Sequence, residues 1–242
     1  MGNDSAPAEG YLRGIIHCHS RFSPDSLVGI PDYIKIAVRK RLDFIILTDH
    51  DATAGSLALQ NAAANFLPHL QVPTAAEYLT DEGDVIAAFV EGELSARNFG
   101  SFVREARARE ALLMLPHPYV GHVHPESLAA ECDLIETVNC RTRDEKNAQA
   151  TQLAQSLAKP AYAGSDAHFA HSIADAVLEV ENLGSLRTSL LKGEIRWEPV
   201  RIAPRWQYGA SQLIKAWKKR DFVLALKVLR RALKEVRRPG SA

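Results

Sequence analysis

The chain has 242 residues, of which 46% are hydrophobic and 24% are charged, and its 29 Lys and Arg balance its 29 Asp and Glu. This composition excludes an intrinsically disordered chain. No apolar run approaches the ~20 residues that a membrane span needs, so we expect a globular protein without one. The three cysteines are too few for a disulfide framework and odd in number, which favours a reducing, cytoplasmic location.

The charges are distributed unevenly along the chain. Residues 201–242 hold 12 of the 29 basic residues but only Asp221 and Glu235 among the acids. The preceding 200 residues are therefore net negative and the last part is strongly positive. We expect three parts, which are a polar, disordered lead at 1–10, a folded domain at 11–200 and a basic helical extension at 201–242.

Short apolar runs alternate with helix-like segments through the folded domain. This alternation is typical of βα units with parallel strands, and the number of runs favours a barrel over an open sheet. We expect strands at 12–16, 43–48, 70–75, 84–90, 111–116, 133–139, 161–164 and 176–181, and helices at 31–41, 55–66, 95–110, 143–158 and 184–192.

The basic extension has an amphipathic pattern. Phe222, Leu226, Leu229 and Leu233 recur at helical spacing, with Lys and Arg on the other faces. The preferred interpretation is that this apolar stripe packs on the barrel or on a second subunit, giving a homo-oligomer. The alternatives are binding to anionic lipid or acidic partners and binding to nucleic acid.

Polar side chains follow six of the expected strands, at the point where each strand ends. In a parallel barrel all these strand ends meet on one face, where such barrels carry out their chemistry. A single histidine in such a place is usually structural, but six strand ends behaving alike are hard to explain by chance. These residues are His17 and His19, Asp49 and His50, Glu77, His117, Asn139 and Cys140, and Asp166 and His168.

The residue types favour a site for transition-metal ions. Histidine and carboxylate ligands predominate, and the chain has neither a Gly-rich phosphate loop nor a serine at a sharp turn. In "HCH", His17 and His19 are two residues apart on a strand, so both point to the same side. Cys18 then points the other way, which predicts a small buried hydrophobic residue and not a nucleophile.

The motifs "HCHS", "LTDHD", "LPHP", "IETVNCR" and "GSDAH", with Glu77 standing alone before "DEGDVIAAF", occur in an order and spacing that resemble the PHP (polymerase and histidinol phosphatase) family. The resemblance runs from about residue 11 to 200. It implies a distorted (β/α)7 TIM-like barrel, two or three bound Zn, Mn or Fe ions, and hydrolysis of phosphoesters by a metal-bound hydroxide.

The resemblance also implies a ligand for each metal. One departure concerns the strand that holds Glu136, after which relatives often place another histidine; here Asn139, Cys140 or a water would fill that position. The implied ligands are His17, His19, Glu77 and Asp166 for the first ion, Glu77 and His117 for the second, and Asp25, His50 and His168 for the third.

Further roles are expected around these ligands. His168 or His50 could protonate the leaving group. Asp49 either fixes the tautomer of an imidazole or caps its own loop. Arg141 and Arg143 either bind a second phosphate or carboxylate of the substrate or stand solvated at a helix start.

These observations predict a metal-dependent phosphoesterase that acts on a small phosphorylated molecule. The alternative within the enzyme class is an exonuclease or nucleotide phosphatase that holds nucleic acid with its basic extension. The alternative of another class is a non-catalytic metal-binding scaffold.

Overall fold

The computed structural model describes residues 8–236, and most of the predicted disordered lead lies outside them. The fold is α/β, as predicted, and it contains two sheets. The helices are α1 Ile30–Lys40, α2 Ala54–Phe66, α3 Phe99–Ala108, α4 Pro125–Glu131, α5 Asp144–Ser156, α6 Leu186–Lys192, α7 Trp206–Lys219 and α8 Phe222–Val236. The strands are β1 Tyr11–Ile16, β2 Phe44–Ile46, β3 Ala75–Leu79, β4 Asp84–Ala88, β5 Leu112–Leu115, β6 Leu134–Asn139, β7 Ala161–Gly164, β8 Leu178–Glu181 and β9 Ile195–Trp197.

The strands do not form one closed, all-parallel barrel within the described residues. One sheet has the order β2-β1-β8-β9 and the other the order β3-β4-β5-β6-β7. Strands β3 and β4 are antiparallel because only four residues join them, which is long enough for a hairpin but not for a parallel crossover. Isolated bridges from Cys18 to Ala167 and from His50 to Glu77 join the two sheets edge to edge.

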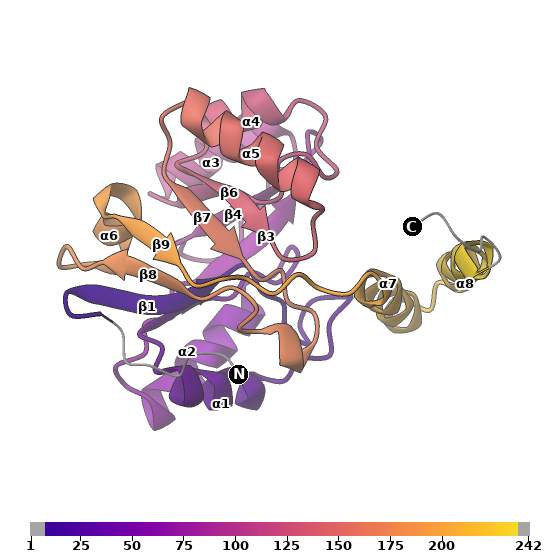
Figure 1. Ribbon diagram of the computed structural model, residues 1–242, viewed down its shortest axis with the longest axis horizontal. Coiled ribbons are helices and arrows are strands. Elements are labelled where there is room, and N and C mark those ends of the chain that lie inside the picture. Colours follow the sequence, from indigo (N-terminus) through magenta and orange to yellow (C-terminus); the bar gives the residue numbers. More distant parts are fainter. Residues whose placement is uncertain (1–7, 237–242) are drawn as a thin grey trace.

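The helices cover the outer faces of these sheets (Figure 1). α1 and α2 lie on one side and pack on β1 and β2 through a cluster that includes Ile15, Ile45 and Leu59. α3, α4 and α5 lie on the opposite side and share a second cluster with the other sheet. A third cluster, with Phe44 and Tyr162, fills the space between the sheets. These three clusters therefore hold the two sheets together, and the ends of their strands point toward the same region of the molecule.

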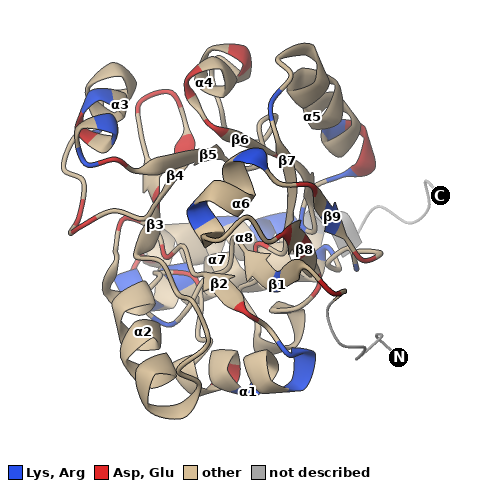
Figure 2. Ribbon diagram, turned by 90° about the vertical axis from the view of Figure 1, so that its left-hand side faces the viewer, with Lys and Arg blue, Asp and Glu red and all other residues tan. Residues whose placement is uncertain are grey.

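The last two helices project from this body. Figure 1 shows α7 beside the strand ends and α8 farther out, and Figure 2 shows acidic and basic residues interspersed over the helices around the sheets. The apolar stripe of α8 does not pack on the body, because Phe222 is 80% exposed and Leu233 59% exposed. That part of the packing prediction is wrong, and a second subunit remains the prediction.

Among the described residues, no helix combines the length and the apolar character that crossing a membrane requires.

Candidate metal centre

Two short segments that carry histidines lie side by side at the edge where the sheets meet. The segment after β1 pairs with the segment after β7, since the His19 amide donates to the Ala167 carbonyl (2.9 Å) and the Asp166 amide donates to the His17 carbonyl (2.7 Å). Both segments therefore direct alternate side chains to one side. The four side chains that meet there are His17, His19, Asp166 and His168, and all are buried.

Glu77 on β3 stands at the centre of the imidazoles. Its Oε2 lies 3.5 Å from His17 Nε2, 3.4 Å from His19 Nε2 and 3.2 Å from His50 Nδ1. Its Oε1 lies 3.1 Å from His117 Nε2. One carboxylate thus touches imidazoles that follow three different strands, as a ligand shared between two ions would.

Two further carboxylates complete the cluster. Asp166 Oδ1 lies 3.4 Å from both His19 Nε2 and His168 Nδ1. Asp25 Oδ2 lies 3.4 Å from His50 Nε2 and 3.2 Å from His168 Nε2. The structure therefore brings all eight predicted ligands together. We call this set the metal centre, and its members are His17, His19, Asp25, His50, Glu77, His117, Asp166 and His168.

The donor atoms of the metal centre fit a metal ion better than they fit one another. Four buried atoms, one each from His17, His19, Asp25 and Glu77, have no hydrogen-bond partner among the described residues. Unsatisfied buried polar atoms are costly and rare, so this concentration calls for an absent partner. Several triplets of these residues also hold ligand atoms within 4.8 Å of one another. Imidazole and carboxylate donors suit Zn, Mn and Fe.

The backbone at the metal centre is strained. His17 has φ 61°, Asp166 has φ 47° and His117 has φ 28°, all in the region that residues with a side chain avoid. Such strain gathers at functional sites, where the surrounding structure enforces it.

Asp84 belongs to the metal centre's surroundings but was not predicted. It is the first residue of β4 and pairs in register with Leu79, which places its carboxylate near His50 and Glu77. Burial, together with the nearby Glu77 carboxylate, raises the pKa of Asp84 to about 6. A short "DEG" turn after Glu77 was the signal for the hairpin that brings it there.

Glu136 on β6 orients the metal ligands without being one. Its Oε1 accepts a hydrogen bond from His17 Nδ1 (2.8 Å), and its Oε2 accepts one from the His117 amide (2.7 Å). The carboxylate fits because residue 164 is glycine, where a Cβ would lie 1.7 Å from Oε1. A carboxylate of this kind fixes the tautomer and direction of an imidazole ligand.

Asn139 stands where relatives often have a histidine. Its Nδ2 donates to Glu136 Oε2 (2.9 Å) and to Asp166 Oδ2 (3.4 Å), while Cys140 is buried in the core between the sheets. Asn139 thus holds two carboxylates of the site in place.

Asp49 does not contact an imidazole, which corrects one of the two roles predicted for it. Its carboxylate accepts hydrogen bonds from the Ser20 amide (2.6 Å) and the Ser20 hydroxyl (2.7 Å). Burial raises the pKa of the Asp49 carboxyl, although these hydrogen bonds lower it. Because Ser20 follows His19, Asp49 braces the loop that carries His19 and does not fix a tautomer.

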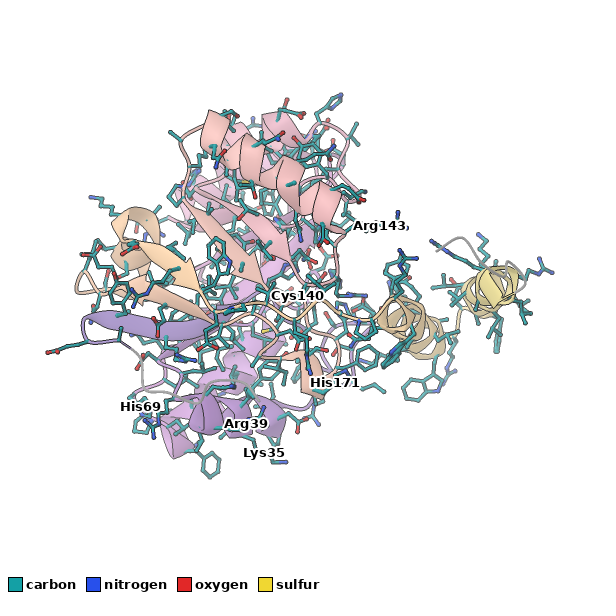
Figure 3. The ribbon with its side chains drawn as sticks, viewed as in Figure 1. Lys35, Arg39, His69, Cys140, Arg143 and His171 are labelled. Carbon is teal, nitrogen blue, oxygen red and sulfur yellow. The ribbon has the colours of Figure 1, made fainter. Side chains whose placement is uncertain are left out.

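The two candidate substrate-binding arginines lie in different places. Arg141 Nη1 is 3.3 Å from Asp166 Oδ1 and 2.7 Å from His168 Nδ1, so its guanidinium lies against the metal centre. Arg143 is exposed at the first turn of α5, and Figure 3 shows it at that helix end. Only Arg141 is placed to contact a substrate at the metal centre.

Cys18 lies as its place between two histidines indicates. It is buried, its Sγ is 3.8 Å from the Ile46 carbonyl, and burial raises the pKa of its thiol. A buried thiol with a raised pKa forms little thiolate, so the geometry leaves it no role as a nucleophile.

The imidazoles of the metal-free protein have unequal pKa values. Burial alone would lower the pKa of His50, but Glu77 and Asp25 raise it to about 9. Burial opposes and Glu77 raises the pKa of His117, also to about 9. Burial, with His168 and His50 beside it, lowers the pKa of His19 to about 3. At neutral pH, His50 and His117 therefore carry protons that a metal ion must displace.

We expect metal binding at about pH 7.5 to release at least one proton per protein molecule, because an imidazole binds metal only when its donor atom is deprotonated. Calorimetric titration with Mn²⁺ in buffers of different ionisation enthalpy measures this number. The raised pKa values also mean that protonation stabilises the metal-free fold below about pH 6.5 and that this contribution is lost as the pH rises through about 9. The release of protons on metal binding should disappear at about pH 10, where both imidazoles are already neutral. Binding without proton release at the lower pH would contradict these charge states.

Comparisons with known proteins show which family and which folds this chain resembles. The profile of a family described as PHP-associated matches residues 144–195. A two-domain protein from Bacteroides vulgatus, containing a predicted PHP-like metal-dependent phosphoesterase, has the same fold with a TM-score of 0.67 at 19% identity, over 81% of this chain and 67% of that chain. A candidate metal-dependent phosphoesterase from Bifidobacterium adolescentis has a TM-score of 0.53 at 14% identity, over 68% of this chain and 90% of that chain.

The matched profile and the shared fold support the resemblance to the PHP family. The segment that matches the PHP-associated profile contributes Asp166 and His168 to the metal centre, and the other six ligands precede it in the chain. An uncharacterized protein from Methanocaldococcus jannaschii is 22% identical over 119 residues, which are 45% of this chain and 68% of that relative.

Proposed function

We propose that this protein is a metal-dependent phosphoesterase of the PHP family that holds two or three Zn, Mn or Fe ions. The observation that carries the proposal is the convergence of eight histidine and carboxylate side chains, four of which have buried donor atoms without partners among the described residues. When bound, such ions activate a water and offset negative charge on a phosphoryl group. A non-catalytic metal-binding scaffold would need the same donors, and hydrolysis of a phosphate ester is the measurement that separates it from an enzyme.

The chain's own residues supply the remaining steps. Arg141 lies against Asp166 and His168, and we assign to its guanidinium the binding of an oxygen of the scissile phosphate. His50 lines the adjoining cavity, whereas His168 is buried, so His50 would protonate the leaving oxygen if it is not itself bound to a metal ion. Glu136 and Asn139 keep His17 and Asp166 in position during turnover.

Replacing Arg141 with alanine should lower kcat/KM for p-nitrophenyl phosphate by about 10²-fold, because the transition state loses a charged hydrogen-bond donor. The matched variant Arg143→Ala removes the same charge from an exposed position two residues away and should stay within about twofold of the wild type. The assay is steady-state hydrolysis by Mn²⁺-loaded protein. Equal effects of the two substitutions would contradict the placement of Arg141, and no hydrolysis by the wild type would contradict the function.

A small phosphorylated molecule fits the site better than nucleic acid. The cavity beside the metal centre has a volume of about 570 Å³, within the range typical of small-molecule pockets. α7 carries three exposed aromatic side chains, Trp206, Tyr208 and Trp217, but none of them lines this cavity, so they offer no stacking surface for single strands there. We further propose a homo-oligomer that covers the exposed stripe of α8, and a reducing, cytoplasmic location, since Cys18, Cys132 and Cys140 are buried and unpaired.

A further inference from the structure

A cavity adjoins the metal centre, and α7 closes one side of it. The metal-centre side is formed by His50 and Asp84. The lining also carries positive charge from Arg21, Lys215, Lys218 and Lys219, three of them on α7. A site for a single phosphate would need only the metal centre and Arg141, so these cations have no role in the chemistry described above.

Hydrogen bonds to two separate parts of the site hold α7 in place. Lys218 Nζ donates to three backbone carbonyls, those of Arg21 (2.8 Å), Ser23 (2.7 Å) and Ser26 (2.6 Å). These carbonyls belong to the loop that carries His19 and Asp25. One turn after the helix begins, Ser211 accepts a hydrogen bond from Arg141 Nη2 (2.9 Å). α7 is therefore fastened to the loop that carries metal ligands and to the arginine that contacts them.

Lys215 and Lys219 are the cations of α7 in this lining that remain available. They are four residues apart on α7, so they lie on the same face of the helix. Neither forms an ion pair with a carboxylate within the described part of the chain, whereas Lys218 is saturated by carbonyls. Two like charges held this close repel each other, and an anion placed between them removes the repulsion.

Part of the cavity lining is apolar. Phe22 and Leu79 line it and are 39% and 57% exposed. The Arg21 guanidinium lies over the Phe22 ring at 5.7 Å. The lining thus combines residues of the metal-centre side, apolar side chains and cations.

We propose that Lys215 and Lys219, with Arg21, bind a second anionic group of the substrate, a phosphate or a carboxylate, while the metal centre holds the scissile phosphate. The substrate is then a small organic molecule with two anionic groups separated by a spacer. This inference rests on the proposed function and specifies its substrate class. It makes the C-terminal helix α7 a determinant of specificity.

Calorimetric titration of the Mn²⁺-loaded protein tests this assignment without turnover. The probes are methylphosphonate and a series of alkane bisphosphonates of increasing length, none of which can be hydrolysed. At least one bisphosphonate should bind about tenfold more tightly than methylphosphonate, the effect of roughly 1.4 kcal/mol from the second anion. The variant Lys215→Ala/Lys219→Ala should lose this advantage and keep the affinity for methylphosphonate.

The matched control is Lys227→Ala/Arg230→Ala, which removes two positive charges from exposed positions on α8 that do not line the cavity. It should retain the full bisphosphonate advantage. The assignment is overturned if no bisphosphonate exceeds methylphosphonate, or if both double variants lose the advantage equally. It is also overturned, in favour of nucleic acid, if a thymidine oligonucleotide binds more tightly than every bisphosphonate. Selective bisphosphonate binding without hydrolysis of any phosphate ester would leave the second anion site standing and refute the proposed function.

Discussion

Replacing Asp166 with asparagine should lower the turnover of p-nitrophenyl phosphate by at least ~10²-fold. Losing a residue that merely orients a metal ligand typically costs 10–100-fold, and Asp166 is placed as a ligand itself. Its Oδ1 lies within 3.7 Å of donor atoms on His17, His19, His168 and Arg141. Asparagine keeps the shape of the side chain but removes the negative charge that attracts a metal ion.

The fold should survive this substitution, which circular dichroism and thermal unfolding would show. In the metal-free protein, burial raises and Arg141 lowers the pKa of Asp166, which ends well below its usual range, so the carboxylate is charged at neutral pH. The matched control Asp144→Asn changes an exposed aspartate in the first turn of α5 and should leave turnover unchanged. Near-normal turnover in Asp166→Asn would refute its assignment as a metal ligand.

Replacing Glu77 with glutamine should remove at least one equivalent of bound metal and lower turnover by more than ~10²-fold. Within the metal centre, Glu77 is the only carboxylate with contacts to four imidazoles, so any ions held by these side chains would lose a negative ligand. The variant should also release fewer protons on metal binding, because the Glu77 carboxylate contributes to the raised pKa of His50 and His117. Metal analysis and the calorimetric proton count measure the two effects.

Glu136→Gln is the matched comparison for this prediction. Glu136 is equally buried, but its side chain contacts one imidazole, that of His17. Its replacement should cost 10–100-fold in metal affinity or turnover, the range for a group that orients a ligand. If Glu136→Gln is the more damaging of the two, Glu77 does not bridge two ions.

The positions of the metal-centre residues could be predicted from the sequence because they depend on local geometry. Residues two apart on an extended segment point the same way, which predicts that His17 lies with His19 and Asp166 with His168. In the structure both pairs lie just beyond the ends of β1 and β7, where the two segments hydrogen-bond to each other. The ends of successive strands then bring these pairs to one edge. The rule needs no knowledge of sheet closure, which explains why it succeeds although the sheets do not close into a continuous barrel.

The residues that the sequence did not reveal depend on contacts between distant segments. Asp84 reaches the site only because β3 and β4 form an antiparallel hairpin, where parallel strands were expected. Asp49 was expected beside an imidazole, since His50 follows it, but Ser20 offers it two hydrogen bonds from another strand end. The "DEG" turn was a local signal for the hairpin, but no local pattern shows that Ser20 meets Asp49.

The basic extension shows the same limit. Its helical period and its charge were evident in the sequence, and α7 and α8 form where that period predicts them. Lys218 fastens α7 because its Nζ donates to three carbonyls of a loop almost 200 residues earlier in the chain. Composition predicts a cationic helix, and only the fold shows that the helix forms a wall of the cavity.

The central claim is that this chain holds a catalytic metal centre. The most direct measurement is elemental analysis of protein purified without chelator, followed by removal and return of the metal in a p-nitrophenyl phosphate assay. We expect at least one to two equivalents of Zn, Mn or Fe, loss of hydrolysis on removal, and recovery with one of these ions. Protein that contains none of the three, and that none of them activates, would contradict the account.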